Sequence, residues 1–231
     1  MKFLFCILLA FCYACPGYAK KYRGESFDYG QIAIIGDSIF AYPLSRRISA
    51  YINDKFYLPV RDYSVNGAVL LRENGPYVIS KQYYDRVKKD LPFIDTIIMD
   101  GGGNDSFAHE NDCVRYNCPE MLDKVIDELS NFFDTLKEDG VTNVIFLGYY
   151  RPKGIKERLG PFLDAVTERI KTTCDTATLN CVFVDPRAVF EYRARENLIV
   201  IDGVHPSSRG ASIIANMINR ELYKMYPLER Q

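Results

Sequence analysis

The sequence has 231 residues, with 29 Lys and Arg against 30 Asp and Glu, so its formal net charge is −1 at neutral pH. A hydrophobic fraction of 48% with 26% charged residues is typical of a globular protein and argues against a disordered chain. Neither the total nor any local run of Lys and Arg supplies the basic excess that neutralises phosphates, so we expect no nucleic-acid partner.

The first 19 residues predict a signal peptide. Residues 3–14 carry no charge and are too few to span a bilayer as a helix, and Gly17 and Ala19 are small residues at the positions that a signal peptidase inspects. We expect cleavage after Ala19, which leaves residues 20–231 as one exported domain without a transmembrane anchor. Two alternatives stay open, namely lipid modification of Cys15 and burial of the apolar run in the core.

Downstream of this segment, apolar runs of strand length alternate with amphipathic helical patterns. The expected strands cover residues 31–35, 58–65, 96–99, 143–147 and 181–184, with a possible strand at 198–201, and the expected helices cover 44–52, 77–89, 119–140, 159–173 and 208–225. Continuous rather than alternating apolar runs are typical of parallel strands that are buried on both faces. The sequence therefore predicts an α/β fold with helices on both sides of a mostly parallel sheet.

Two polar motifs follow strands of this sheet, where ligands bind in such folds. In Gly36-Asp37-Ser38 a serine hydroxyl lies beside helix N–H groups, which suits a nucleophile, although a simple helix cap explains the tripeptide equally well. In Asp202-Gly203-Val204-His205-Pro206 the carboxylate can accept a hydrogen bond from His205 Nδ1, which leaves Nε2 as an acceptor. This is the spacing of an orienting acid and a general base.

Two further motifs offer hydrogen-bond donors after the second and third strands. Asn66-Gly67-Ala68 presents the unhindered N–H of Gly67, and Gly102-Gly103-Asn104-Asp105 presents the side-chain amide of Asn104. Such donors stabilise the oxyanion that forms during acyl transfer, although each motif alone also describes an ordinary turn. The sequence has two histidines, and we expect the other one, His109, to be a solvated loop residue.

Four cysteines remain after residue 19, namely Cys113, Cys118, Cys174 and Cys181. In an oxidising compartment their close spacing favours the pairs Cys113–Cys118 and Cys174–Cys181, although three pairings are possible. A zinc site with His109 is the competing interpretation, but the cysteine spacings are loose for it.

Together, the four motifs resemble the sequence blocks of the SGNH, or GDSL, hydrolase family, in order and in strand context. The resemblance extends from about residue 31 to residue 226 and implies a flavodoxin-like, three-layer α/β/α fold and hydrolysis of esters through a serine acyl-enzyme. It makes Ser38 the nucleophile, His205 the base and Asp202 its orienter. It also implies an oxyanion hole formed by the N–H groups of Ser38 and Gly67 and the Asn104 amide, while Asp37 and Asp105 are expected to be structural.

Alternatives remain open at this point. The same loops could hold a divalent cation through Asp37, Asp105, Asp202 and His205, the chain could be a catalytically silent module that binds a glycan or a lipid, or the triad could pass the acyl group to a sugar hydroxyl. Serine chemistry requires no cofactor and no metal. Export favours acylated polysaccharide or phospholipid over other ester substrates, and a bacterial periplasmic or secreted location is expected. Residues 149–150, a tyrosine pair, could stack on a sugar or belong to the core.

Overall fold

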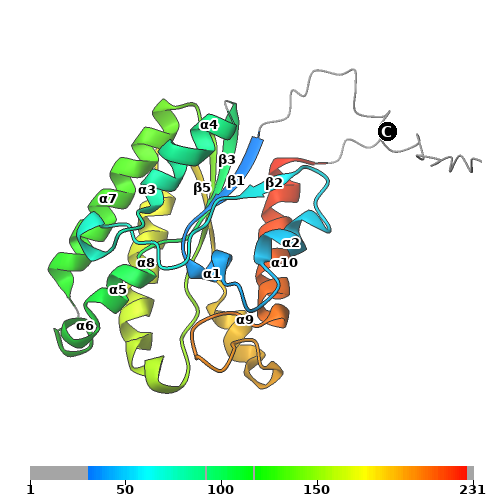
Figure 1. Ribbon diagram of the computed structural model, residues 1–231. Helices are drawn as coiled ribbons and strands as arrows, with labels where there is room; N and C mark the ends of the chain where they lie inside the picture. Colours follow the sequence, from blue (N-terminus) through cyan, green and yellow to red (C-terminus); the bar gives the residue numbers. More distant parts are fainter. Residues whose placement is uncertain (1–30, 92, 117, 228–231) are drawn as a thin grey trace, which may run out of the picture.

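The computed structural model describes residues 31–91, 93–116 and 118–227, so the predicted signal peptide lies outside the described residues. Five strands form one sheet in the order β2-β1-β3-β4-β5, and every neighbouring pair is parallel (Figure 1). The strands are β1 (Gln31–Ile35), β2 (Val60–Asp62), β3 (Ile94–Met99), β4 (Asn143–Leu147) and β5 (Asn180–Val184). This order is that of flavodoxin-like doubly wound sheets, so the predicted fold class is confirmed.

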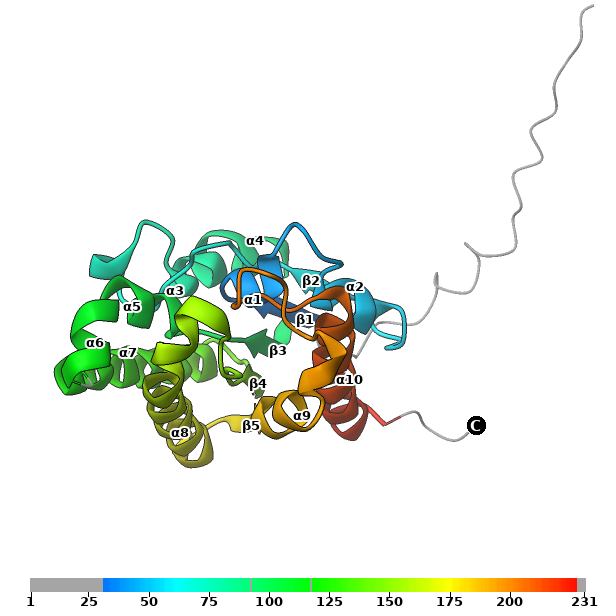
Figure 2. The ribbon, with the colours of Figure 1, turned by 90° about the horizontal axis from the view of Figure 1, so that it is seen from below.

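The helices cover both faces of the sheet, as Figures 1 and 2 show. On one face lie α3 (Ile79–Gln82), the π-helical turn η2 (Tyr83–Val87), α4 (Lys88–Asp90), α7 (Pro119–Glu138) and α8 (Gly160–Thr176). On the other lie α2 (Ile48–Asn53), α9 (Arg187–Tyr192) and α10 (Ser208–Met225). Alternate residues of each central strand point to opposite faces, so Ile97 and Met99 pack in one core and Ile98 in the other.

Shorter elements surround the carboxyl edge of the sheet, which faces the viewer in Figure 2. They are α1 (Ser38–Ala41), η1 (Arg72–Asn74), α5 (Gly103–Ala108), α6 (Glu110–Tyr116), η3 (Gly154–Leu159) and η4 (Ala194–Glu196). The carboxyl ends of parallel strands meet at one edge, so the segments that follow β1, β3 and β4 lie side by side there.

Several predicted boundaries differ from the structure. The helix expected at 44–52 begins at Ile48, and a separate turn of helix starts at Ser38. The strand expected at 58–65 pairs regularly only over Val60–Asp62, although the N–H groups of Tyr63 and Val65 still donate to β1 and the turn that follows it. The possible strand at 198–201 is wrong, because only an isolated antiparallel bridge joins Ile199 to Pro206.

Both predicted disulfides are present. Cys113–Cys118 closes the short segment between α6 and α7, and Cys174–Cys181 ties the end of α8 to β5. Between the strand expected at 96–99 and the helix expected at 119–140, where the sequence predicted no helix, lie the short helices α5 and α6.

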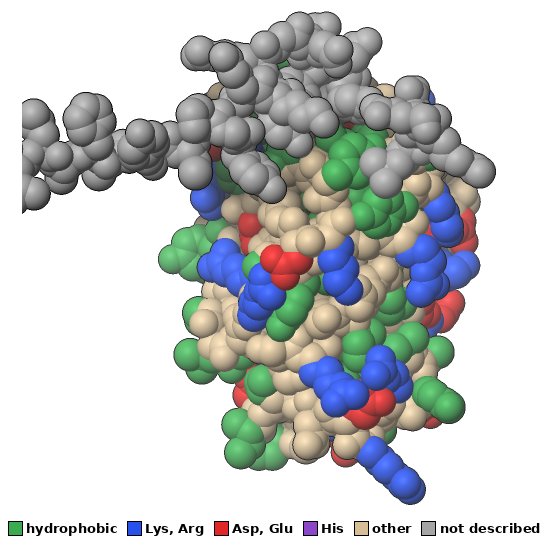
Figure 3. All heavy atoms as spheres, turned by 90° about the vertical axis from the view of Figure 1, so that its right-hand side faces the viewer, with side chains coloured by type: hydrophobic (Ala, Val, Ile, Leu, Met, Phe, Trp, Pro, Cys, Tyr) green, Lys and Arg blue, Asp and Glu red, His purple; other side chains and the backbone are tan. Residues whose placement is uncertain are grey.

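Lys and Arg side chains are spread over the face seen in Figure 3, with acidic and apolar side chains between them. Of the helices in the described part of the chain, none is both long and apolar enough to span a bilayer.

Candidate active site

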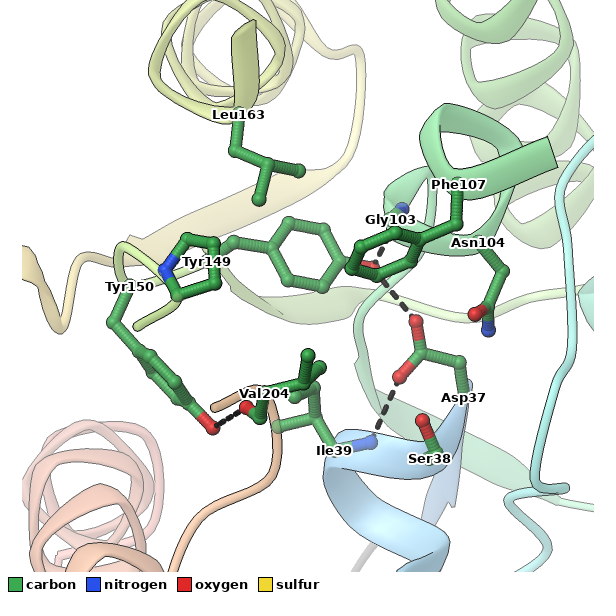
Figure 4. Close-up of a pocket in the computed structure, with 11 residues that line it drawn as sticks. Asp37, Ser38, Ile39, Gly103, Asn104, Phe107, Tyr149, Tyr150, Leu163 and Val204 are labelled. Atoms are coloured by element: carbon green, nitrogen blue, oxygen red, sulfur yellow. Dashed lines mark hydrogen bonds between the residues drawn. The ribbon is translucent and has the colours of Figure 1, made fainter. Parts of the chain in front are cut away.

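A small pocket opens at the carboxyl edge of the sheet (Figure 4). Its cavity volume is about 20 Å³, which is room for about one water-sized group. Its walls are mostly apolar and come from segments far apart in the sequence: Ile39, Phe107, Tyr149, Tyr150, Pro152, Leu163 and Val204. Its polar lining is made by Asp37, Ser38, Gly103 and Asn104, so two of the predicted site residues meet here.

Ser38 is the first residue of α1 and is 8% exposed. The turn before it is fixed by Asp37, whose Oδ1 accepts a hydrogen bond from the N–H of Ile39 at 2.8 Å and thereby caps the helix. N–H groups in the first turn of a helix have no partner within the helix, so the Ser38 N–H is available to an oxygen in the pocket. Among the described residues, the hydroxyl of Ser38 forms no hydrogen bond.

His205 and Asp202 form the pair that their spacing predicts. His205 Nδ1 lies 2.7 Å from Asp202 Oδ2, and the other carboxylate oxygen accepts from the N–H groups of Val204 and His205 at 2.9 and 3.0 Å. Partial burial works to raise the pKa of Asp202, but these hydrogen bonds from His205 and Val204 outweigh it and lower the pKa. The ring of Tyr42 stacks on the imidazole, with centroids 4.1 Å apart and planes 7° from parallel.

His205 Nε2 is buried and has no hydrogen-bond partner among the described residues. Because Asp202 fixes the proton on Nδ1, Nε2 carries a lone pair. Val204, the residue before His205, lines the same pocket as Ser38. His205 thus directly follows a residue of the wall around Ser38, and among the described residues its side chain forms no hydrogen bond with that of Ser38.

The predicted oxyanion donors lie on neighbouring turns. Asn104 Nδ2 donates to the carbonyl of Ala68 at 2.8 Å, which places the Asn104 amide beside the turn that contains Gly67. Gly67 has φ +77°, a left-handed conformation that favours glycine. Asp105 joins the same two segments, because its carboxylate accepts from the N–H groups of Leu70 and Leu71 at 2.8 and 2.9 Å. Asp105 is structural in this position, as predicted.

Three buried polar residues hold the Ser38 turn in place, and the sequence did not indicate this role for any of them. The Gln82 amide hydrogen-bonds to both the N–H and the carbonyl of Gly36, at 2.8 and 2.9 Å, and Asp100 Oδ1 accepts from the N–H of Asp37 at 2.7 Å. Tyr149 donates to Asp37 Oδ2 at 2.9 Å and accepts from the N–H of Gly103 at 3.0 Å (Figure 4). One hydroxyl thus connects the Ser38 turn with the turn that carries Asn104.

Burial shifts the titration of this cluster. Burial raises the pKa of Asp37, and this effect is larger than that of the hydrogen bonds from Ile39 and Tyr149, which lower the pKa. Burial, followed by the charge of Asp37, raises the pKa of Asp100 well above its usual range, and the same two causes raise the pKa of the Tyr149 phenol.

The remaining sequence expectations concern residues next to the pocket. His109 is half-buried and its Nε2 pairs with Asn74 Oδ1 at 2.8 Å, so it is held by a partner rather than freely solvated. Tyr149 and Tyr150 are only 8% and 5% exposed, so they belong to the core rather than to a sugar-stacking surface. Asp37, Asp105 and Asp202, which the metal hypothesis needs as ligands, each accept backbone N–H donors instead.

A larger cleft of about 610 Å³ adjoins the small pocket and shares Pro152 with it. Its lining combines charged side chains, among them Arg151, Glu157 and Glu191, with apolar residues such as Leu198 and Ile199. It is next to the Asp202–His205 loop, because the Lys153 N–H donates to the carbonyl of Gly203 at 2.7 Å.

No protein-family profile matches the sequence, and no curated protein matches it. The fold, however, is that of solved SGNH hydrolases. A variant of Axe2, an acetyl-xylooligosaccharide esterase from Geobacillus stearothermophilus, superposes with a TM-score of 0.64 at 20% identity, over 87% of this chain and 97% of that one.

Two further solved structures share the fold. A protein assigned as an SGNH hydrolase from Slackia heliotrinireducens has a TM-score of 0.59 at 15% identity, over 84% of this chain and 98% of that one. A protein assigned as a GDSL-like lipase from Parabacteroides merdae has a TM-score of 0.63 at 16% identity, over 81% of this chain and 93% of that one.

Proposed function

We propose that this protein is a serine ester hydrolase that removes short acyl groups, foremost acetyl, from the hydroxyls of a glycan. The observation that carries the proposal is the Asp202–His205 pair. Within the described ranges the buried Nε2 of His205 has no hydrogen-bond partner, and the preceding residue, Val204, lines the pocket of Ser38. A lone pair held next to a serine at a helix N-terminus is the arrangement that activates a nucleophile.

The chemistry follows from these positions. His205 Nε2 takes the proton of the Ser38 hydroxyl while Oγ bonds to the ester carbonyl carbon. The resulting oxyanion receives hydrogen bonds from the N–H groups of Ser38 and Gly67 and from the Asn104 amide. The imidazolium returns its proton to the leaving alcohol, and the acyl group remains on Ser38. Water then attacks the acyl-enzyme by the same route and releases the acid.

The solved structures support this assignment by analogy. Two of the Axe2 structures are catalytic mutants in which a serine and a histidine, respectively, are replaced by alanine. A serine and a histidine are also the central pair proposed here, on a fold that superposes over most of both chains.

The two cavities support the choice of substrate. A pocket with apolar walls and room for about one water-sized group accommodates an acetyl methyl but not a long acyl chain. The larger cleft beside it offers guanidinium and carboxylate groups, which hydrogen-bond to sugar hydroxyls. A glycan alcohol in the cleft and an acetyl group in the pocket therefore fit better than a lipid.

The proposal includes where the protein acts. Residues 20–231 would form one exported domain after removal of the predicted signal peptide, because the two disulfides of the domain need an oxidising compartment.

The first test is labelling with a fluorophosphonate probe and mapping of the modified peptide. We expect label on Ser38 that disappears in Ser38→Ala and in His205→Ala. Ser64→Ala is the matched control, since Ser64 is also 8% exposed and precedes the Gly67 turn. Labelling that persists in Ser38→Ala would remove the nucleophile assignment, and a folded protein without any label would favour a silent binding module.

The second test compares p-nitrophenyl acetate, butyrate and octanoate, followed by an acetylated xylo-oligosaccharide and a phospholipid. We expect kcat/KM to fall steeply from acetate to octanoate, because each added methylene exceeds the pocket, and acetate to be released from the oligosaccharide. Equal or rising rates with chain length would contradict the glycan assignment in favour of a lipid ester.

A further inference from the structure

Asp100 is a buried acid that the proposed mechanism does not use. It follows β3 directly and is 0% exposed. Its Oδ1 accepts the N–H of Asp37 at 2.7 Å, but its Oδ2 is buried and has no hydrogen-bond partner among the described residues. An ionised carboxylate in the protein interior is strongly unfavourable when one of its oxygens accepts no hydrogen bond.

Asp37, its neighbour, has the opposite surroundings. One of its oxygens accepts the N–H of Ile39 at 2.8 Å and the other accepts the hydroxyl of Tyr149 at 2.9 Å. Two donors stabilise the charged form of Asp37. Asp100 has, in the part of the chain that the structure describes, one donor to Oδ1 and no hydrogen-bond partner at Oδ2. The two residues are held together, because Asp100 Oδ1 lies 2.7 Å from the backbone nitrogen of Asp37. Both are at most 2% exposed, and a pair of carboxylates cannot both ionise in a shared buried site.

We propose that Asp37 and Asp100 hold one proton between them, carried on Asp100, and that protonated Asp100 is a positioning residue for the turn that bears Ser38. The second half of this proposal rests on the proposed function, whereas the shared proton does not. The shared proton stays on Asp100 throughout ester hydrolysis and is not transferred to the substrate. Asp100 therefore takes no part in the chemical steps.

The connection to Ser38 is short. Gln82 and Asp100 together bind three successive backbone groups, the N–H and carbonyl of Gly36 and the N–H of Asp37. Gly36 fits here because a Cβ at this position would lie 2.0 Å from Asp100 Oδ1. Loss of the shared proton would place a second negative charge against Asp37 and displace this turn, and with it the hydroxyl of Ser38.

The pH dependence follows from the groups that face the pair. Tyr149, which comes after β4, donates to Asp37, and His205, in the loop before α10, lowers the pKa of Asp37 when its imidazole is protonated. Gln82 of α3 is neutral and does not titrate. Tyr149 keeps its proton, because burial and the charge of Asp37 raise the pKa of its phenol. Release of a proton from this cluster at alkaline pH is therefore assigned to the aspartate pair.

Infrared spectroscopy tests the shared proton without any reference to activity. At neutral pH we expect the wild-type protein to show the band of a protonated carboxylic acid, and Asp100→Asn to lack it. Asp62→Asn is the control, since Asp62 is an aspartate at the same sheet edge whose oxygens accept from Ser49 and Ser64 at 2.5–3.0 Å. Absence of the band in the wild type, or its persistence in Asp100→Asn, would overturn the proposal.

Kinetics test the positioning role. Asn at position 100 keeps an oxygen for the Asp37 N–H and adds an uncharged donor. We therefore expect kcat of the wild type to fall at alkaline pH, and Asp100→Asn to keep most of kcat at neutral pH without that fall. Asp100→Leu should lower kcat on the order of a hundredfold with little change in KM, because a small displacement of a reacting group has that effect.

The outcomes are distinguishable. An alkaline limb in Asp100→Asn that matches the wild type and Asp62→Asn would contradict the positioning role, even if Asp100→Leu does not fold. Fluorophosphonate labelling rates at Ser38 provide the same pH profile when no ester is turned over. Failure of the Ser38→Ala control would reject the esterase proposal but leave the infrared result intact.

Discussion

His205 and Tyr42 lie face to face, and this stack restricts the plane of the imidazole in a way that the hydrogen bond from Asp202 alone does not. A ring held only at Nδ1 can rotate about that bond, whereas a stacked neighbour 4.1 Å away blocks the rotation. Tyr42 is therefore expected to keep Nε2 directed at the pocket. Aromatic pairs of this kind contribute about 0.5–1.5 kcal/mol beyond the area that they bury.

We predict that Tyr42→Ala lowers kcat about tenfold, which corresponds to the upper end of that contribution, while Tyr42→Phe retains the stack and most of the activity. Steady-state kinetics on p-nitrophenyl acetate measure the difference. Similar losses in both variants would assign the effect to the Tyr42 hydroxyl instead of the ring.

Asp202 gives the site a defined response to acid. Its pKa is lowered in the folded protein, because hydrogen bonds from His205 and Val204 outweigh the effect of partial burial. A carboxyl group with a lowered pKa stabilises the fold above its unfolded pKa of about 3.9, and this stabilisation is lost as the pH falls through the lower folded value.

We predict that urea unfolding of Asp202→Asn, compared with wild type, shows less loss of stability below about pH 4, together with a large fall in kcat at neutral pH. The kcat fall is expected because the amide no longer fixes the proton on Nδ1. An unchanged acid dependence would mean that other carboxyl groups dominate it.

The candidate residues could be predicted from the sequence where they belong to short motifs of neighbouring residues. Ser38 and Asn104 stand in short motifs after strands, and Asp202 and His205 share one loop before α10. These motifs, taken together, indicated their places. The residues that support them were not predictable, because Gln82 reaches Gly36 across 46 positions and Tyr149 reaches Asp37 across 112. Contacts of this kind depend on the order of strands in the sheet.

At the level of elements, the turn between β1 and α1 is the most constrained segment of the site. Gly36 has φ +140° and faces the Asp100 carboxyl, so a side chain there meets both backbone strain and a clash. Gly140, after α7, has φ +91° but open space around it. Comparing alanine substitutions at the two glycines therefore distinguishes the cost of backbone strain alone from the added cost of a steric clash.

We predict that Gly36→Ala destabilises the protein by about 3 kcal/mol or more, in the range of a severe core substitution. Gly140→Ala should cost only about 1 kcal/mol, from the left-handed conformation alone. Denaturant unfolding of the two variants gives both values. Equal losses would show that Asp100 can move aside.

Element boundaries show what sequence patterns determine. Helices α7 and α10 were predicted to within two residues, because each has a regular apolar stripe and a clear end, such as Gly140. Helices α5 and α6 were missed because they are short and polar and follow a run of glycines. The apolar residues 198–201 indicated a strand, but the chain there turns back on itself, and Leu198 packs into the core beside α10.

At the scale of the whole molecule, the two disulfides lie at opposite ends of the strands, one at the carboxyl edge of the sheet and the other at the amino edge. Cys113–Cys118 joins α6 to the start of α7 at the edge of the candidate site, where Glu110 of α6 forms ion pairs of 2.6 Å with Lys156 and Arg158 of η3. Cys174–Cys181 joins the end of α8 to the beginning of β5, at the opposite edge. Each closes a short loop, which corresponds to about 2 kcal/mol of stabilisation on the chain-entropy estimate.

Replacing either cysteine pair by alanine should therefore lower the free energy of unfolding by similar amounts, but only loss of Cys113–Cys118 should alter catalysis. Phe107, which lines the small pocket, lies just before α6, so a looser α6 changes the pocket wall. We predict a reduced kcat/KM for short esters in Cys113→Ala with Cys118→Ala, and an unchanged value in Cys174→Ala with Cys181→Ala. Denaturant unfolding and ester kinetics on both double variants measure the two effects separately. Equal kinetic losses in the two would mean that activity follows global stability rather than the wall of the pocket.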